Sequence, residues 1–201
     1  MEISLVRHSI SLSNGAGLIS GAGADVALSD AGITYAELVR DAYDWQQFDR
    51  IYVSPMKRAK QTAALLTMAR QPMIEDARLQ EMDFGDWEGQ QAAELKHDFP
   101  AAFDYQDMFS EAMPDLSPNA ETYAHLLART AAFLADAEAA TPAGKVLVVC
   151  HGFTIRALLA NLLHTDFYHF APVGNVSLTR LHLDEHDDFR ARLEQFNILL
   201  A

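Results

Sequence analysis

The chain has 201 residues, half of them hydrophobic, which is enough for one core with a small cap and too little for two full domains. The formal net charge is −13 with only fifteen Lys and Arg residues, and this argues against broad binding to nucleic acid or to a membrane. One cysteine excludes an internal disulfide framework and a Cys-rich metal site. Without a signal-peptide pattern or an 18-residue apolar run, a cytoplasmic protein is expected.

Helix and strand signals alternate in the first part of the chain. A buried strand is predicted over 3–6, followed by a loop over 9–25 that has no periodic pattern. Ser29 is a candidate N-cap for a helix that reaches about Tyr43. A strand over 51–53 follows, and Pro55 is expected in the first turn of a helix that ends near Arg70.

The segment from 90 to 118 differs, because three prolines break it into short helical pieces. We expect it to be a cap inserted over the edge of the sheet. The remaining predictions are a helix over 121–138, a strand over 145–150, a helix over 154–163, a strand over 177–183, and a segment over 189–200 that fits either element. The pattern predicts a single domain over 1–201 with an α/β fold, a three-layer α/β/α sandwich with a mostly parallel central sheet and a small helical insertion.

Two histidines stand where predicted strands end. Arg7 and His8 follow the first strand, and His151 and Gly152 follow the strand over 145–150. Because ligands of such folds bind at the carboxyl ends of the strands, we expect both imidazoles in one crevice. A neutral imidazole nitrogen can attack phosphorus while a neighbouring guanidinium neutralises the phosphoryl oxygens.

Three further features fit phosphate chemistry. Arg58 lies one turn into a helix that follows a strand, close to a positive helix end. The loop over 79–89 carries four carboxylates, any of which could protonate a leaving alcohol. Gly152 allows the backbone to approach an oxyanion at the start of a helix.

Together these segments resemble the histidine phosphatase superfamily, also called phosphoglycerate-mutase-like, branch 1. The matching pieces appear in the family's order and are Leu5-Val6-Arg7-His8, Leu28-Ser29-Asp30-Ala31-Gly32, the run from Ser54 to Thr62, Glu81 with the run from Phe84 to Gly89, and His151-Gly152. Each is short, but five in register make chance an unsatisfactory explanation.

The resemblance implies a metal-independent phosphomonoester hydrolase without a cofactor, acting through phosphohistidine on a small phosphorylated metabolite. In that interpretation His8 is the nucleophile and Glu81 protonates the leaving oxygen and then activates water. Arg7, Arg58 and His151 hold the phosphoryl group. Asn14 stands where the family often has a phosphate-contacting asparagine, and Ser11 where it usually has threonine. We expect His8 to be neutral and His151, beside a bound dianion, to be protonated.

The chain departs from the family pattern at three places. Ser9 replaces the usual glycine after the catalytic histidine, and Ile10 replaces an acidic or amide residue. Ser9 either hinders the approach of phosphate or adds a hydroxyl donor. The Gly-Glu-Ser segment common before the long helix is Asn119-Ala120-Glu121-Thr122 here, so Glu121 has either a role in the site or a role in capping its helix.

Other interpretations stay open. Cys150 and Arg156 have the Cys-x5-Arg spacing of cysteine-dependent phosphatases, although bulky Phe153 and Ile155 and the apolar strand favour an inert buried thiol. The aromatic residues of the cap are expected to form its own small core, with a substrate wall as the less favoured interpretation. No metal pair is expected at His182, Asp184 and His186. A mutase and a catalytically weak phospho-ligand-binding module are the alternatives. The physiological substrate and the oligomeric state are not fixed, and a homodimer stays open.

Overall fold

The computed structural model describes all 201 residues and contains one six-stranded sheet. The strands are β1 (Glu2–Arg7), β2 (Arg50–Val53), β3 (Met73–Glu75), β4 (Lys145–Cys150), β5 (Leu178–Asp184) and β6 (Arg190–Ile198). Their order is β3-β2-β4-β1-β5-β6; the first four strands pair in parallel, and β5 pairs antiparallel with both of its neighbours, β1 and β6. The predicted mostly parallel sheet is confirmed.

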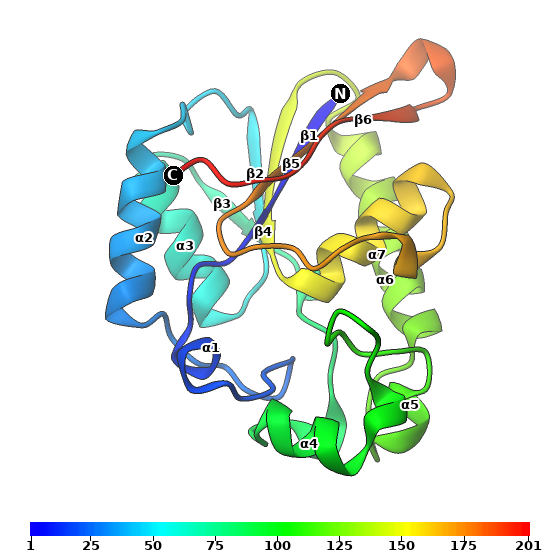
Figure 1. Ribbon diagram of the computed structural model, residues 1–201. Helices are drawn as coiled ribbons and strands as arrows, with labels where there is room; N and C mark the ends of the chain where they lie inside the picture. Colours follow the sequence, from blue (N-terminus) through cyan, green and yellow to red (C-terminus); the bar gives the residue numbers. More distant parts are fainter.

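Helices cover both faces of this sheet (Figure 1). The α-helices are α1 (Leu12–Ala16), α2 (Asp30–Asp41), α3 (Lys57–Thr67), α4 (Ala92–Asp98), α5 (Met113–Leu116), α6 (Tyr123–Ala140) and α7 (Gly152–Leu163). Short 3₁₀ helices lie at η1 (Ala77–Leu79), η2 (Gly85–Trp87), η3 (Pro100–Ala102), η4 (Phe167–His169) and η5 (Glu185–Asp187). α2 and α3 lie on one face and α6 and α7 on the other, which gives the three layers of the predicted sandwich.

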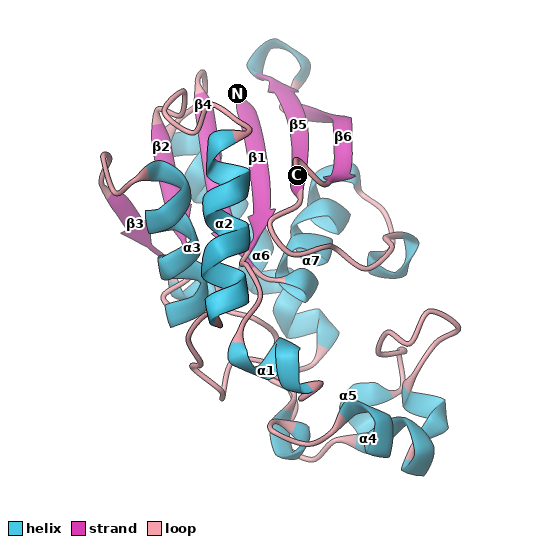
Figure 2. Cartoon of the chain, turned by 60° about the vertical axis from the view of Figure 1, so that its left-hand side comes forward, coloured by secondary structure: helices cyan, strands magenta, loops and turns pink.

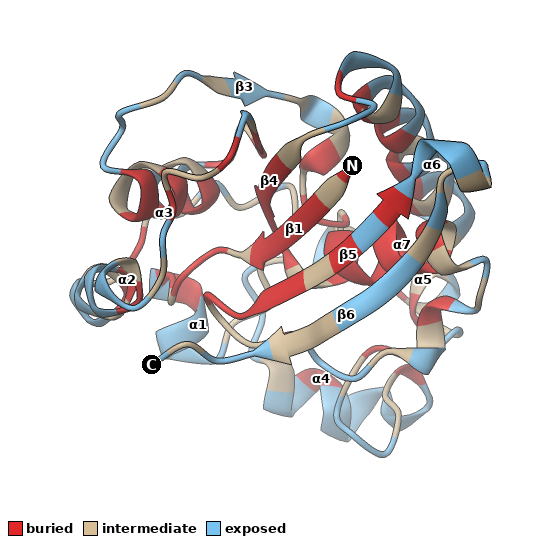
Figure 3. Cartoon of the chain, turned by 90° about the horizontal axis from the view of Figure 1, so that it is seen from above, coloured by how far each residue is buried: buried red, intermediate tan, exposed pale blue.

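The alternation of side chains along β1 builds a core on each face. Ile3 and Leu5 pack in the cluster under α6 and α7, whereas Val6 packs in the cluster under α2 and α3. β1 and β4 are buried on both faces, as Figure 3 shows by their colour, and their sequences are accordingly apolar for most of their length. These two central strands therefore give firm support to the residues that directly follow them in the chain.

The segment over 90–118, which we call the cap, lies beyond the carboxyl ends of the parallel strands, on the same side as α1 (Figure 2). It consists of α4, η3, an irregular turn and α5. Its buried side chains, among them Leu95, Phe109 and Met113, share a third core cluster with Phe153 of α7. The cap is therefore anchored to the sandwich through the helix that follows β4.

The structure corrects several predicted boundaries. The loop over 9–25 contains α1, which is held by a capping box between Ser11 and Asn14. Pro55 lies before α3 rather than in its first turn, because Met56 is still extended and is the N-cap. α6 begins at Tyr123 with Thr122 as its cap, so Glu121 does not cap that helix.

Two strands could be assigned only from the structure. β3 was not predicted, because it has only three residues and none of them is fully buried. The ambiguous segment over 189–200 is the edge strand β6, most of whose residues are only partly buried or exposed. Its side chains show no clean alternation, which explains why the period did not decide between helix and strand.

Candidate active site

The two histidines lie side by side at the carboxyl ends of the two central strands. β1 and β4 pair in parallel with Arg7 opposite Cys150, so the next residue of each strand enters the same space. The backbone N–H of His8 donates to the carbonyl oxygen of Cys150 at 2.9 Å. The ring centroids of His8 and His151 are 5.1 Å apart, and the residues are 4 % and 0 % exposed. The two imidazoles lie together at this edge of the sheet, as predicted, although neither lines the neighbouring cavity.

The ring of His8 is oriented by a bond to the neighbouring backbone. Its Nδ1 lies 2.6 Å from the carbonyl oxygen of Ser9, and because a carbonyl only accepts, Nδ1 carries the hydrogen. Burial, followed by the charges of Arg7 and Arg58, lowers the pKa of His8 well below its usual value. His8 is therefore neutral, with the lone pair on Nε2 available for attack.

His151 is held by a hydroxyl group rather than by a charge. Its Nε2 lies 2.7 Å from Oγ of Ser54, the residue that follows β2, while its buried Nδ1 has no protein partner. Burial and the nearby Arg58 lower the pKa of His151 as well. The protein alone thus keeps both histidines neutral, and the predicted protonated His151 requires the negative charge of a bound phosphate.

Two arginines supply positive charge beside the histidines. Nη1 of Arg7 donates to the carbonyl oxygen of Val173 at 2.6 Å, and its Nε is buried without a partner. Arg58 is 1 % exposed, and its Nη1 and Nη2 donate to the carbonyl oxygens of Ala24 and Gly21 at 2.9 and 3.1 Å. Its Nε is also buried without a partner. Both guanidinium groups keep N–H donors that a phosphoryl oxygen could satisfy.

The carboxylate of Glu81 is fixed at the start of α7. Its oxygens accept from the backbone N–H groups of Phe153 and Thr154, each at 3.2 Å, and from the N–H of Met82 at 3.0 Å. The hydroxyl of Thr154 lies 3.2 Å from Oε1 of Glu81. Three backbone N–H groups therefore hold one carboxyl group beside Gly152, because the hydroxyl of Thr154 gives its one hydrogen to the carbonyl oxygen of Gln80 at 2.6 Å. Residues 81–84 themselves have no helix or strand. No other acidic residue of that loop lines the cavity described next.

A cavity of about 200 Å³ opens in front of these groups, and Arg7, Asn14, Glu81 and Gly152 are among the residues that line it. A Cβ on Gly152 would lie 3.7 Å from Nε of Arg7 and 3.8 Å from Oε2 of Glu81, so the glycine keeps the approach between them open. Ser11 does not line the cavity. Its hydroxyl and backbone N–H both bond to Oδ1 of Asn14 within the capping box, which leaves the amide nitrogen of Asn14 free for a ligand.

The departures from the family pattern have local structural roles. The hydroxyl of Ser9 donates to the carbonyl oxygen of Gly32 at 2.7 Å, and the N–H of Ser9 donates to the hydroxyl of Thr62 at 2.9 Å. The carbonyl oxygen of Ile10 accepts from both the N–H and the hydroxyl of Ser29. These contacts tie the strand end to α2 and α3, so the Ser9 hydroxyl is not a free donor for phosphate.

Cys150 is an inert thiol in this structure. It is fully buried in β4, and burial strongly raises the pKa of the thiol. Arg156 is not part of a phosphate loop either, because its guanidinium lies 4.2 Å from the ring centre of Phe167 and 5.2 Å from that of Phe153. The Cys-x5-Arg interpretation is therefore physically disfavoured.

Sequence reasoning missed several residues that hold the site together. Nδ2 of Asn175 donates to the carbonyl oxygen of His8 at 2.8 Å, and the N–H of Val176 donates to that of Arg7 at 3.0 Å. Val176 has a φ of 51°, an unusual value for a β-branched residue that marks a locally strained segment. Only the Gly174-Asn175 pair, a turn signal before β5, hinted at this segment. Ser54 and Thr154 gave no signal beyond their places next to a strand end and a helix start.

No group of three or more His, Cys, Asp or Glu side chains is arranged to hold a metal ion, and none of the helices combines the length and the apolar character that a membrane span requires. Arg7 and Glu81 instead line one cavity, and the two neutral imidazoles and the guanidinium group of Arg58 lie buried beside them without lining it. Such an arrangement is typical of an enzyme that acts on phosphoryl groups.

Comparisons with known proteins agree with this class. A profile of the histidine phosphatase superfamily (branch 1) matches residues 3–198. An adenosylcobalamin/alpha-ribazole phosphatase from Salmonella typhimurium is 31% identical over 164 residues, which cover 81% of this chain and 80% of that protein. Phosphoserine phosphatase 1 of Hydrogenobacter thermophilus is 29% identical, covering 92% and 88%. A solved mycobacterial glucosyl-3-phosphoglycerate phosphatase is 26% identical, with a TM-score of 0.83 and coverage of 98% and 99%.

The chain belongs to the histidine phosphatase superfamily, branch 1. It is a phosphatase, a phosphoric monoester hydrolase like its named relatives, and it adopts their α/β fold over nearly its whole length.

Proposed function

We propose that the protein hydrolyses phosphomonoesters through a covalent phosphohistidine at His8. The observation that carries the proposal is the orientation of the His8 ring: Nδ1–H is engaged by Ser9, and Nε2 is an unprotonated nucleophile beside Arg7 and Arg58. In the first step the Nε2 lone pair attacks phosphorus and the bond to the ester oxygen breaks. The carboxyl group of Glu81 gives its proton to that oxygen, and the alcohol leaves.

In the second step water attacks phosphorus, the bond to Nε2 breaks, and inorganic phosphate is released. The Glu81 carboxylate takes the proton from the water, which restores the acid for the next cycle. Arg7, Arg58, His151 and the amide of Asn14 bind the phosphoryl oxygens, whose charge spreads in the transition state. Gly152 leaves room for this group. These roles rest on the contacts described above and on the chemistry of the donor set.

The substrate class follows only in outline from the relatives, whose printed activities concern small phosphorylated metabolites. We propose a small-molecule phosphate ester and no nucleic-acid partner, in keeping with the net charge of −13. A cytoplasmic location fits the single cysteine, which is a buried free thiol. A homodimer stays a prediction that the molar mass in solution tests.

The test is hydrolysis of p-nitrophenyl phosphate in excess EDTA from pH 5 to 8, with wild type, His8→Ala and Cys150→Ala. Activity that disappears only in His8→Ala supports the proposal. Activity that survives the loss of His8, or that needs a metal, would falsify it. Transfer of phosphate to an added alcohol faster than to water favours the mutase alternative, and binding without turnover favours the phospho-ligand-binding module.

A further inference from the structure

The cavity that Glu81 lines has two chemically different sets of lining residues. Arg7, Glu81 and Gly152 lie where the phosphoryl group is proposed to bind. Four phenylalanines form an aromatic wall, and they are Phe84, Phe103, Phe109 and Phe153. The ring centroids of Phe84 and Phe109 are 5.0 Å apart, as are those of Phe103 and Phe109, and Phe84 and Phe153 are 5.3 Å apart. Whatever is esterified to the phosphate meets this aromatic wall.

A single turn of the cap supplies two of the four aromatic residues of that wall. Phe103 and Phe109 pair across the turn, and the N–H of Asp104 donates to the carbonyl oxygen of Met108 at 2.8 Å. The carboxylate of Asp104 accepts from the N–H groups of Gln106 and Met108. The turn thus presents Phe103, Met108 and Phe109 to the cavity, while Tyr105 at its tip is 92 % exposed.

The charges of the wall restrict the leaving group. Arg7 is the only Lys or Arg residue that lines the cavity, and it belongs to the phosphate end. Asp107 lies in the wall and forms an ion pair with Lys96, which does not line the cavity. A carboxylate on the leaving group would meet the like charge of Asp107 and no cation of the lining other than Arg7 at the phosphate, and this is unfavourable. An uncharged ring, by contrast, finds aromatic partners.

We infer that the substrate is a phosphate monoester of an uncharged alcohol that carries an aromatic or similarly flat apolar group, and that esters with a carboxylate are poor substrates. The inference rests on the proposed function and names the leaving group of the same site.

Three primary alkyl phosphates with the same scissile linkage test it: 3-phenylpropyl phosphate, propyl phosphate and the phosphate ester of 3-hydroxypropanoate. We expect kcat/KM to be at least about 10-fold higher for the phenyl compound than for propyl phosphate, and lower again for the carboxylate. Met108→Arg places a cation in the wall and is expected to raise the carboxylate-to-phenyl ratio at least about 10-fold. Tyr105→Arg adds the same charge to the exposed tip of the turn and should leave the ratio unchanged.

Equal kcat/KM values for the three esters, or a preference for the carboxylate in the wild type, overturn the inference. The same holds if the two arginine variants change the ratio equally. In each of these cases the proposed function still stands if the wild type hydrolyses p-nitrophenyl phosphate and His8→Ala does not. Absence of any turnover overturns both.

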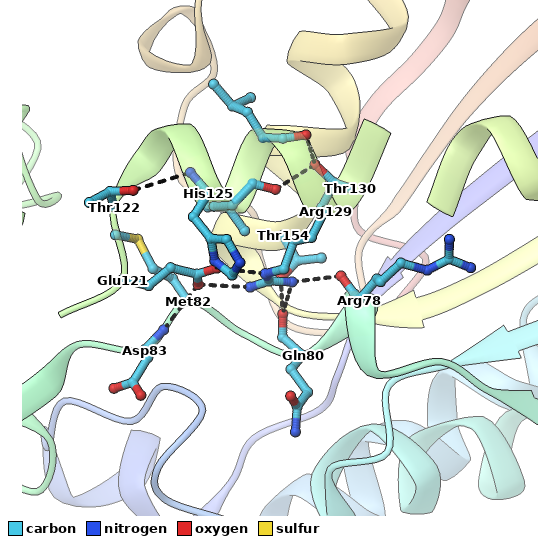
Figure 4. A network of polar contacts seen from close by, with 12 residues as sticks. Arg78, Gln80, Met82, Asp83, Glu121, Thr122, His125, Arg129, Thr130 and Thr154 are labelled. Carbon is cyan, nitrogen blue, oxygen red and sulfur yellow. Dashed lines mark hydrogen bonds and ion pairs between the residues drawn. The ribbon is translucent and has the colours of Figure 1, made fainter. Parts of the chain in front are cut away.

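A second inference rests on a different part of the molecule, the polar cluster around Glu121 and Arg129 (Figure 4). Arg129 of α6 forms a forked ion pair with Glu121, with Nε to Oε1 at 2.7 Å and Nη2 to Oε2 at 3.0 Å. Both side chains are nearly buried, with 13 % and 9 % of their surface exposed. The pair is therefore better shielded from water than an ordinary surface salt bridge.

The other donors of Arg129 bind the backbone that leads to Glu81. Nη1 donates to the carbonyl oxygens of Arg78 and Gln80 at 2.6 and 2.9 Å, and Nη2 lies 3.2 Å from that of Glu81. Glu121 holds the chain on the other side, because its N–H donates to the carbonyl oxygen of Asp83 and its carboxylate accepts from the N–H of Asp83. Glu81 is thus bracketed within a segment that has no helix or strand of its own.

We propose that Arg129 and Glu121 are positioning residues for Glu81, acting through its backbone and touching neither phosphate nor leaving group. This proposal rests on the role of Glu81 as the acid. Protonation by Glu81 matters for an alkoxide, which leaves poorly, and matters little for p-nitrophenolate, which leaves without a proton. The decrease in kcat/KM caused by removing this pair should therefore depend on the leaving group.

The experiment compares kcat/KM for propyl phosphate and p-nitrophenyl phosphate in Arg129→Met and Glu121→Gln. We expect losses of about 10- to 100-fold for the alkyl ester and less than about 3-fold for the nitrophenyl ester. Asp136→Asn removes a different ion pair of α6, the exposed bond to Arg78 at 2.7 Å, and should change neither value. Glu121→Gln keeps the volume of the side chain, so it serves if Arg129→Met does not fold.

Equal losses for the two esters, or no loss for either, overturn the positioning role. Glu81→Gln must show the same dependence on the leaving group with a larger loss. If it does not, the acid itself is assigned wrongly, which is a failure of the proposed function and distinguishable from failure of the positioning pair.

Discussion

The carboxyl ends of β1 and β4 and the cap differ in how their side chains are fixed. At the strand ends, His8, His151 and Arg58 are almost completely buried, and each is held by a bond to a distant part of the chain or to the neighbouring carbonyl. In the cap, α4, η3 and α5 are short, and the turn over 103–109 is held mostly by its own backbone and by Asp104. The groups proposed to react are therefore held by contacts with distant segments, whereas the wall proposed to contact the leaving group is held by contacts within its own turn.

This division separates the reaction from substrate choice. The cap can change its turn without moving the histidines, because it reaches the sandwich mainly through packing in the cluster around Phe153. Changes at the strand ends, in contrast, affect groups that several elements hold in common. Substitutions in the two regions should therefore have different consequences, and the four predictions below test that difference.

The largest effect is expected at the end of β1. His8→Ala removes the proposed nucleophile, and kcat/KM for p-nitrophenyl phosphate should fall on the order of 10⁴-fold. Cys150→Ala, also buried at a strand end but without a role in the reaction, should retain activity within about 3-fold, with a small loss of stability. Equal losses in the two variants would indicate that the strand ends act only through folding.

The strand ends should also make stability depend on pH. Burial, with the charge of Arg58 and for His8 first that of Arg7, lowers the folded-state pKa of both histidines below the unfolded value of about 6.5. Stability from this source is complete above pH 6.5. It falls as the pH decreases below 6.5, because only the unfolded chain takes up the protons, with a slope that approaches about 2.7 kcal/mol per pH unit for two histidines. Urea denaturation between pH 7 and 5.5 measures the slope, and a flat profile contradicts the buried neutral state.

The join between cap and sandwich gives a smaller effect. Gly85 has a φ of 58°, and a Cβ there would lie 2.1 Å from the carbonyl oxygen of Pro118, at the other end of the cap. Gly89 has a similar φ of 79° but open space around it. Replacing either glycine by alanine should lower the free energy of unfolding by about 1 kcal/mol because of the backbone conformation. Gly85→Ala should lower it by about 2 kcal/mol more because of the clash. Equal free energies of unfolding for the two variants would show that the cap shifts freely at this point.

The smallest effect is expected at the tip of the cap. Tyr105→Ala removes a side chain that is 92 % exposed, so the free energy of unfolding should stay within about 0.5 kcal/mol of the wild type. Activity toward every ester should also be unchanged, because Tyr105 does not line the cavity. A clear change in kcat/KM would mean that the tip folds over the substrate and that the cap is less local than the contacts indicate.

Much of the fold follows from the sequence where the signal is long or periodic. The apolar runs of β1 and β4 and the Ser29 cap of α2 were predicted, and they are the elements with the most complete burial or the clearest cap. α1 and β3 were not predicted because five and three residues are too few to show a period. The edge strand β6 is long enough, with nine residues, but it shows no alternating face because none of its residues is buried.

The residues of the site can also be divided into those that the sequence predicted and those that it did not. The proximity of His8 and His151 was predictable, because parallel strands deliver their last residues to one edge. The roles of Ser54, Asn175 and Arg129 were not, since each depends on a contact between residues that are 48 or more positions apart. The resemblance to a family supplied Glu81 among four competing carboxylates, which composition and spacing alone left open.

The hydrogen bond from Nδ1 of His8 to Ser9 also has a consequence for detection. Phosphohistidine exists as two regioisomers that differ in the ring nitrogen bonded to phosphorus, and here one of the two nitrogens is already occupied by the carbonyl. A trapped phosphoenzyme should therefore contain only the Nε2 isomer. An antibody selective for that isomer should recognise it, and an antibody selective for the Nδ1 isomer should not.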